Sequence, residues 1–322
     1  MQVKGSLSMP ATHKARPIFV FGALRSGTTV FRLMLNAHDG ISNPGEADYL
    51  FDFLARDGSG SWAYDLPRLR ESRTFLASRL TIPEGLDGLA LLDDFLAQLQ
   101  VRGDGAFTLN IHRGIGHIAE ILPECKVIHM LRDPRDVARS SIGMGWAGNT
   151  YYGIDHWIRT EQEWTDAAPR LNPETVMELR YEALFRDIEA ELNRVCAFVG
   201  VPFNPAMLDY HLSTAYGPPD VKLVEQWKRK AAPRELSLLE GKLGALLAAR
   251  GFAPSGHTPA KPSAAEGFSL FRDNKSKKFR WSVKSYGFST VVLEKLTRWA
   301  GLHSLNQIYR RRINSIVEQM LK

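Results

Sequence analysis

Short apolar runs alternate with segments of helical periodicity over the first two thirds of the chain. Four segments are short, mostly apolar and bounded by turn residues, as buried strands are: Ile18–Phe21, Ala106–Ile111, 126–131 and 174–182. Between them, apolar residues recur at helical spacing over 30–37, 115–122, 152–166 and 189–199. Strands that alternate with helices predict an α/β fold with a central parallel sheet and right-handed crossovers.

Weaker patterns complete this prediction. Ile41–Ser42 is expected to begin a short second strand after a turn. Segment 48–100 has apolar stripes at helical spacing and is expected to be helical, with a polar loop at 57–61. Segment 233–250 is expected to be one helix that ends before Gly251.

The composition changes twice near the C-terminal end. Residues 253–267 are rich in Pro, Ala, Ser and Gly, which is typical of a linker. Beyond it, 268–322 has apolar residues along one helical face, so we expect a helical C-terminal extension. Residues 1–16 are polar and are expected to be a flexible N-terminus, which leaves 17–252 as the main domain.

The net charge of +6 is unevenly distributed. Segment 268–322 holds 12 Lys and Arg against 3 Asp and Glu, a charge of +9, so the remainder has −3. An acidic main body argues against a nucleic-acid partner. For the basic extension the sequence leaves three roles open: homo-oligomerisation, an additional layer on the core, or contact with a membrane surface.

Cysteine usage and hydropathy bear on the compartment. Cys125 and Cys196 are the only cysteines, too few for a disulfide framework, which fits a reducing cytoplasm. No apolar run has the length of a membrane span, and the N-terminal residues lack the apolar core of a signal peptide. Because histidines and cysteines are not clustered at metal-binding spacing, no metal site is predicted.

The strongest chemical signal is the loop after the first strand. Gly22 and Gly27 have the spacing of a P-loop, but Thr28 stands where a nucleoside-triphosphate binder has Lys. Arg25 is the cation of this loop. Backbone N–H groups and hydroxyls complete an anion-binding loop, with the hydroxyls supplied by Ser26, Thr28 and Thr29. The loop is therefore predicted to bind a phosphate group without the lysine of an ordinary ATPase.

A second cation follows the strand at 126–131. Asp133 is a suitable N-cap and Pro134 a suitable first residue of a helix, so Arg132 is placed at the carboxyl end of a central strand. P-loop NTPases usually have a magnesium-organising Asp at that position. A cation there favours direct binding of an anion, and Ser140 lies two helical turns further on.

These motifs resemble those of sulfotransferases that use 3′-phosphoadenosine-5′-phosphosulfate (PAPS), and the resemblance covers roughly residues 17–251. It implies a three-layer P-loop-like fold and transfer of a sulfonate from PAPS, leaving 3′-phosphoadenosine-5′-phosphate (PAP), with no metal required. Arg25–Thr29 (RSGTT) is similar to the family's 5′-phosphosulfate loop, and Arg132 with Ser140 to its 3′-phosphate signature. Tyr181, in Tyr-Glu-x-Leu, resembles the residue that contacts adenine, while Lys228 and Arg229 resemble a segment that closes over the nucleotide.

The resemblance implies two candidates for the general base. Glu46 follows Gly45 as in the bacterial and tyrosylprotein branch, where the Glu is the proposed base. His112 matches the His of the Lys-x-His triplet of cytosolic members, but Asn110 replaces the Lys. Arg113 is a candidate for the missing positive charge. The sequence does not choose between Glu46 and His112.

Two other classes of function stay open at this point. One is a P-loop kinase or NTPase-like phosphotransferase, which lacks its Lys at Thr28 and its metal-holding acid at Arg132. The other is a non-catalytic protein that retains only the nucleotide site. The acceptor is also open, and a hydroxyl or amine on a saccharide, a lipid, a peptide or a small metabolite fits the sequence.

Overall fold

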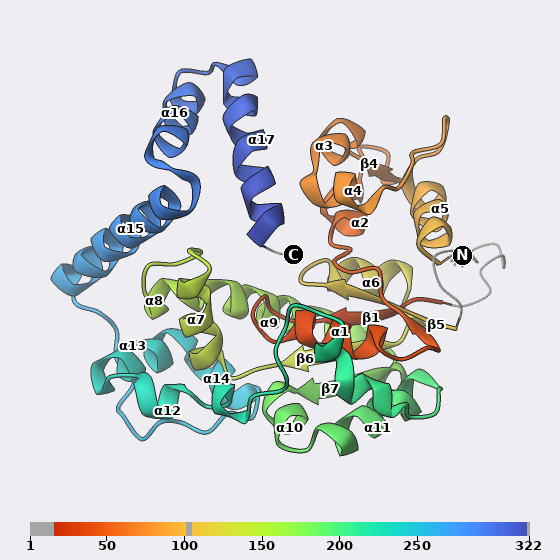
Figure 1. Ribbon diagram of the computed structural model, residues 1–322, viewed down its shortest axis with the longest axis horizontal. Helices are drawn as coiled ribbons and strands as arrows, with labels where there is room; N and C mark the ends of the chain where they lie inside the picture. The colour runs from red at the N-terminus through yellow and green to blue at the C-terminus, as the bar shows by residue number, and fades with distance from the viewer. Residues whose placement is uncertain (1–15, 101–104, 321–322) are drawn as a thin grey trace, which may run out of the picture.

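A five-stranded parallel sheet forms the centre of the main body (Figure 1). The computed structural model describes residues 16–100 and 105–320, with side chains up to residue 317. The expected flexible N-terminus, 1–16, thus lies outside the described residues except for its last residue. The strand order is β2-β5-β1-β6-β7. The strands are β1 (Ile18–Phe21), β2 (Ile41–Ser42), β5 (Ala106–Ile111), β6 (Val127–Leu131) and β7 (Val176–Arg180).

Alternation along the strands explains the three layers, because successive side chains point to opposite faces. Phe19 and Phe21 of β1 belong to the core on one face, and Ile18 and Val20 to the core on the other. The first core is completed by α5 (Gly88–Gln100), α6 (Ile115–Ile121) and α9 (Asp155–Ala167). The second is completed by α1 (Thr28–Asn36), α10 (Tyr181–Arg186), α11 (Ile188–Val199) and η3 (Pro205–Leu212). The predicted α/β three-layer architecture is therefore confirmed.

The segment expected to be helical around a loop at 57–61 contains an antiparallel hairpin. The prediction of helix over all of 48–100 is wrong at β3 (Leu54–Arg56) and β4 (Trp62–Tyr64), which flank that loop. Contacts made in the folded state override the local periodicity here. The Arg56 guanidinium lies 4.6 Å from the centre of the Trp62 ring, and the Tyr64 hydroxyl donates to Leu50 O at 2.7 Å. Helices surround the hairpin: α2 (Tyr49–Asp52), α3 (Leu66–Glu71) and α4 (Arg73–Ser78).

Two other expected elements differ in extent. The helix expected over 233–250 is divided into α13 (Pro233–Leu243) and α14 (Ala245–Ala249). Gly244 separates them with φ of 56°, in the left-handed region that glycine adopts most readily. The strand expected at 174–182 ends at Arg180, so Tyr181 opens α10. The other described elements are α7 (Pro134–Gly143), α8 (Thr150–Gly153), η1 (Ala168–Arg170), η2 (Pro173–Thr175), η4 (Val221–Leu223) and α12 (Trp227–Lys230).

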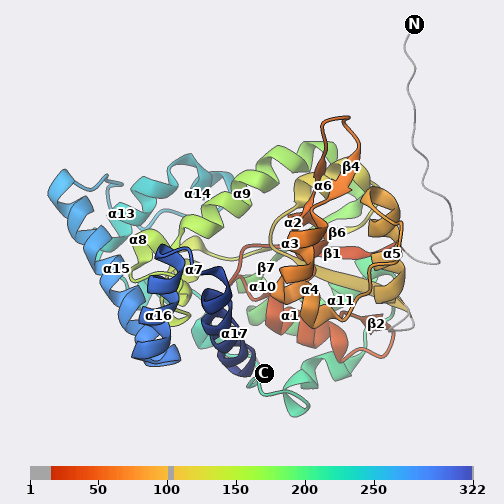
Figure 2. The same ribbon diagram turned by 90° about the horizontal axis from the view of Figure 1, so that it is seen from above.

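The C-terminal extension is helical, as predicted. It consists of α15 (Ala264–Tyr286), α16 (Phe288–Trp299) and α17 (His303–Met320), which we call the C-terminal arm. In Figures 1 and 2, α15 runs beside α7 and α8, whereas α16 and α17 stand away from the sheet. Among the described helices, none combines the length and the apolar character needed to cross a bilayer.

Candidate active site

The loop between β1 and α1 has the strained backbone of an anion-binding turn. Arg25 and Gly27 have φ of 72° and 93°, in the left-handed region. A Cβ atom at Gly27 would lie 2.5 Å from the Tyr181 ring, so only glycine fits between that ring and the loop. The Ser26 hydroxyl is fully buried and, among the described residues, has no hydrogen-bond partner. A buried hydroxyl without a partner is costly unless a ligand satisfies it.

The second predicted anion-binding segment contacts this loop directly. Arg25 Nε donates to Ser140 Oγ at 3.0 Å, and Arg132 Nη1 donates to Arg25 O at 2.9 Å. Asp133 caps α7 by accepting from Arg135 N at 2.9 Å, as the sequence predicts. Because β6 is next to β1 in the sheet, Arg132 emerges at the same edge as the loop. Two segments more than 100 residues apart thus form one cationic cluster.

The two guanidinium groups of this cluster are close enough to affect each other. Burial lowers the pKa of Arg25, and the charge of Arg132 lowers it further. Arg132 lies over the Tyr181 ring, 3.9 Å from its centre, and its Nε has no partner among the described residues. Arginine remains protonated under all ordinary conditions, so the repulsion is relieved only by an anion. Unsatisfied donors beside two fixed positive charges suit the phosphate groups of a nucleotide.

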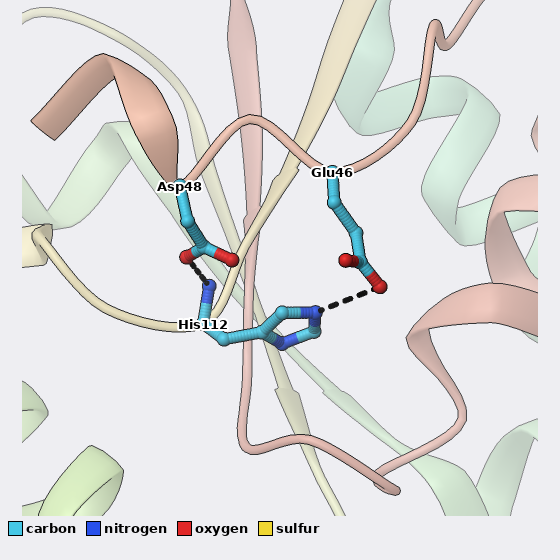
Figure 3. A group of neighbouring side chains, drawn as sticks. All are labelled: Glu46, Asp48 and His112. Atoms are coloured by element: carbon cyan, nitrogen blue, oxygen red, sulfur yellow. Dashed lines mark hydrogen bonds and ion pairs between the residues drawn. The ribbon is translucent and has the colours of Figure 1, made fainter. Parts of the chain in front are cut away.

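The two base candidates face each other beside the loop (Figure 3). His112 Nε2 lies 3.8 Å from Glu46 Oε1, and His112 Nδ1 lies 2.7 Å from Gly22 O. Since a carbonyl oxygen only accepts hydrogen bonds, Nδ1 carries a proton and Nε2 is directed at the carboxylate. The His112 side chain is buried and the Glu46 side chain is 49% exposed.

The facing groups shift each other's pKa in opposite directions. Contact with His112 lowers the pKa of Glu46 from its ordinary 4.5, against the effect of burial. For His112, burial favours the neutral form, but Glu46 and the charge of Asp48 outweigh it and raise the pKa above 6.5. Near neutral pH the pair therefore tends toward a carboxylate facing an imidazolium.

Asp48 completes this group and makes it the one described cluster with metal-ligand geometry. Single ligand atoms of Glu46, Asp48 and His112 lie within 4.8 Å of one another. Asp48 Oδ1, however, accepts from His112 N at 2.7 Å, and Asp48 Oδ2 lies 3.8 Å from Arg113 Nη1. Arg113 also pairs with Asp52, so its charge is shared between two carboxylates and is not directed at the loop alone.

Of the other predicted nucleotide contacts, Tyr181 packs against the cationic cluster, whereas Lys228 and Arg229 lie apart from it. Tyr181 is 4% exposed, and its ring packs against Arg132 and Phe185, so it supports the loop by packing. Lys228 pairs with Glu225 at 2.8 Å, and Arg229 donates to Lys222 O at 2.6 Å. Lys228 also lines a cavity of about 670 Å³ whose walls include Arg135, Glu182 and Trp227 but not the loop.

Two residues for which the sequence predicted no role contact the site. Asn110, at the position of the missing Lys, donates to Thr28 O at 3.0 Å and accepts from Asn43 Nδ2 at 2.9 Å. It thereby joins the start of α1 to the segment that carries Glu46. Trp146 lies beside Arg25, with the guanidinium carbon 5.9 Å from its ring centre. The sequence signal for Asn110 was an amide side chain near the end of a mostly apolar strand.

Comparison with known proteins points in one direction. A family model described as "Sulfotransferase family" matches residues 17–205. A protein of Aquifex aeolicus (strain VF5), named only as uncharacterized, is 24% identical over 214 residues. The match covers 61% of this chain and 27% of that relative, so it spans about a quarter of the relative's length.

Two solved structures show the same fold. One is the sulfotransferase domain from the curacin biosynthetic pathway, with 19% identity, a TM-score of 0.51, and coverage of 74% of this chain and 99% of that one. The other is the sulfotransferase domain from the Synechococcus PCC 7002 olefin synthase. It has 20% identity, a TM-score of 0.50, and coverage of 70% of this chain and 91% of that one.

Proposed function

Because its matched region is more than half of the chain, this protein belongs to the sulfotransferase family, and we propose that it transfers a sulfonate from PAPS to an acceptor hydroxyl or amine. One observation carries the choice of donor: Arg25, Ser140 and Arg132 form one connected cluster. PAPS has phosphate groups at its 5′ and 3′ positions, and ATP lacks the 3′-phosphate that a second cationic group would bind.

Each side chain of the cluster has a distinct task in this proposal. Arg25, Ser26, Thr28 and Thr29, with the loop N–H groups at Gly27, bind the 5′-phosphosulfate. Arg132 and Ser140 bind the 3′-phosphate. Ser140 Oγ accepts from Arg25, so its own hydroxyl proton is available to donate to a phosphate oxygen. Tyr181 supports the loop and borders the adenine. Lys228 and Arg229 approach the nucleotide when η4 and α12 close over the donor site.

The transfer forms one bond to sulfur and breaks another. The acceptor oxygen or nitrogen attacks the sulfur of PAPS, and the bond from sulfur to the 5′-phosphate oxygen breaks. The electron pair of that bond stays with the phosphate, giving PAP, while the acceptor proton moves to a base on the protein. Arg25 and the loop N–H groups stabilise the charge that develops on the leaving phosphate, because they are already oriented toward it.

We assign the base to Glu46 and a positioning role to His112. The lowered pKa of Glu46 keeps it ionised, and half of its side chain is exposed to an incoming acceptor. The raised pKa of His112 favours the imidazolium, which has no free lone pair to take a proton. Its positive charge lies where cytosolic members have their Lys-x-His triplet, and so compensates for Asn110.

The compartment and the acceptor are part of the proposal. Cys125 and Cys196 are buried free thiols, which supports work in the reducing cytoplasm. The acceptor group belongs to a saccharide, a lipid, a peptide or a small metabolite. A phosphotransferase is not favoured, since Thr28 and Arg132 replace the Lys and the acid that such an enzyme needs.

Thermal unfolding with nucleotides tests the donor assignment. PAP is expected to raise the unfolding temperature more than AMP, which lacks the 3′-phosphate, and more than Mg-ATP. Ser140→Ala is expected to weaken PAP binding about tenfold, since it removes one charge-assisted hydrogen bond to the 3′-phosphate, and to weaken AMP binding less, through the lost support of Arg25. Ser141→Ala is the matched control, because this neighbouring hydroxyl donates to Val137 O within α7. Preferential stabilisation by Mg-ATP would overturn the proposal.

A further inference from the structure

The α16–α17 hairpin of the C-terminal arm holds polar side chains at its centre. Thr290, Thr297 and Asn306 are 2%, 7% and 8% exposed, beside the buried Val291. The Asn306 amide donates to Thr297 Oγ1 at 3.1 Å and to Glu294 O at 2.7 Å. The contact between the two helices thus includes hydrogen bonds from a buried polar side chain, beside apolar ones.

The outer surface of the hairpin carries several exposed apolar side chains. On α16, Phe288, Leu296 and Trp299 are 63%, 52% and 88% exposed, and their spacing puts them on one helical face. Further exposed apolar side chains follow directly along the chain: Leu302 at 49%, Leu305 at 48% and Ile308 at 59%. Scattered apolar residues on a surface are ordinary, but a succession of this kind marks a binding surface.

Basic residues accompany this apolar surface. The exposed cations of this part of the arm are Lys284, Lys295, Arg298, Arg310, Arg311 and Arg312. Segment 268–322 as a whole has a charge of +9, in a chain whose remainder is acidic. An apolar helical face with Trp and Phe, next to Lys and Arg, is the composition of helices that lie at a membrane–water interface.

We propose that the α16–α17 hairpin docks on the surface of an anionic lipid bilayer. The Phe288–Trp299 face enters the headgroup level, and the basic side chains contact anionic lipids, each strengthening binding about fivefold near such a surface. A second copy of the chain is the competing occupant. A two-fold contact between hairpins would bring two copies of the same basic residues together, five Lys and Arg against two Glu in each hairpin, so charge favours the lipid surface.

The arm is fixed to the body next to the donor site. Asn274 Oδ1 accepts from Gly148 N at 2.7 Å, and Trp281 Nε1 donates to Gly143 O at 3.2 Å. The Trp281 ring occupies the space where a Cβ at Gly145 would lie. The next residue, Trp146, borders Arg25. Because α15 contacts the loop that borders Arg25, it links the hairpin to the donor side of the site (Figure 1).

Vesicle co-sedimentation tests the surface without using sulfonate transfer. The full chain is incubated with vesicles of phosphatidylcholine alone, or of phosphatidylcholine with 30% phosphatidylglycerol (about 7:3), at low salt and at about 0.5 M NaCl. Binding to the anionic vesicles is expected to be at least tenfold stronger than to the neutral ones, and to weaken at high salt. Equal binding to both vesicles, or binding to neither, would overturn the proposal.

Variants separate the two components of docking. Trp299→Ser with Phe288→Ser is expected to reduce binding at least tenfold, and so is reversal of Arg310–Arg312 to Glu. Leu76→Ser on α4 is the matched control, because Leu76 is 62% exposed, as Phe288 is 63% exposed. Thermal unfolding verifies that each variant is folded. A concentration-dependent dimer that these substitutions dissociate, without vesicle binding, would identify a second copy as the occupant and refute the proposal.

Discussion

The donor side and the acceptor side of the site use charge in different ways. On the donor side the charges are the guanidinium groups of Arg25 and Arg132, which stay protonated and are held by Ser140 Oγ and by backbone carbonyls. On the acceptor side the charges belong to Glu46 and His112, two titratable groups that face each other. The first arrangement is permanent, whereas the second depends on the position of a proton.

The donor side is also more buried than the acceptor side. Ser26 and Arg132 are 0% and 7% exposed, while the Glu46 side chain is 49% exposed. The buried donors of the loop and of Arg132 are ordered during folding, so among the donor groups only η4 and α12 have to move when the nucleotide binds. The exposed carboxylate remains accessible to acceptors of different shape. Apart from Arg25, which serves both, nucleotide affinity and proton transfer therefore depend on different residues, and proton transfer can be changed alone.

The sharpest test of this separation is Glu46→Gln. Glutamine keeps the shape and loses the proton acceptor, so kcat is expected to fall about 10²–10⁴-fold, the usual contribution of a positioned general base. The affinity for PAP, measured by calorimetry, is expected to stay within about twofold of the parent. His112→Gln is expected to have a smaller effect on kcat, since it removes the positioning group and its charge but not the base.

Glu84→Gln, on the exposed loop between α4 and α5, is the matched control and is expected to leave both quantities unchanged. If Glu46→Gln retained the parent kcat while His112→Gln lost it, the base would be His112. If PAP affinity fell together with kcat, the donor and acceptor sides would not be independent.

The sequence was enough to predict that the donor-side residues lie together, because their placement follows from sheet order. Gly22, Gly27 and Arg25 lie in one continuous loop, and Arg132 follows an apolar strand directly. In a parallel sheet the carboxyl ends of all strands share one edge, so these residues had to approach each other if β1 and β6 were neighbours. The Asp133–Pro134 helix start, confirmed by the cap to Arg135 N, fixed the orientation of α7 and thus of Ser140.

The acceptor side was less predictable, because it depends on contacts between segments. No pattern in the sequence indicates that Glu46 and His112 face each other. That arrangement depends on the bridge between Glu46 and Asn110, on the positive φ of Gly45, and on the carbonyl of Gly22. The β3–β4 hairpin was not predicted for the same reason, because it too depends on contacts made in the folded state. The buried polar side chains between α16 and α17 were not predictable either, because Thr297 and Asn306 resemble ordinary surface residues until the helices are paired.

The pH dependence of kcat sharpens the comparison further. With Glu46 as base, activity is expected to rise as pH passes the pKa of Glu46, below 4.5. It is then expected to fall to a lower plateau as His112 loses its proton, at a pH above its ordinary 6.5, because that loss removes the positioning charge but not the base. Over about pH 7 to 9 the affinity for PAP is expected to stay constant, since guanidinium groups do not titrate there. A rate that increases through a pKa above 6.5 would instead identify neutral His112 as the base.

The smallest expected effect concerns metals, and it distinguishes a proton acceptor from a ligand set at the same atoms. The ligand atoms of Glu46, Asp48 and His112 lie close enough to hold a cation. A cation there would occupy the carboxylate lone pair that takes the acceptor proton, and would compete with the imidazolium for Glu46. EDTA is therefore expected to change kcat by less than about twofold, and added Zn²⁺ to inhibit. Loss of activity in EDTA that a specific divalent ion restores would contradict the assignment, with Glu84→Gln assayed in parallel to exclude effects on exposed carboxylates.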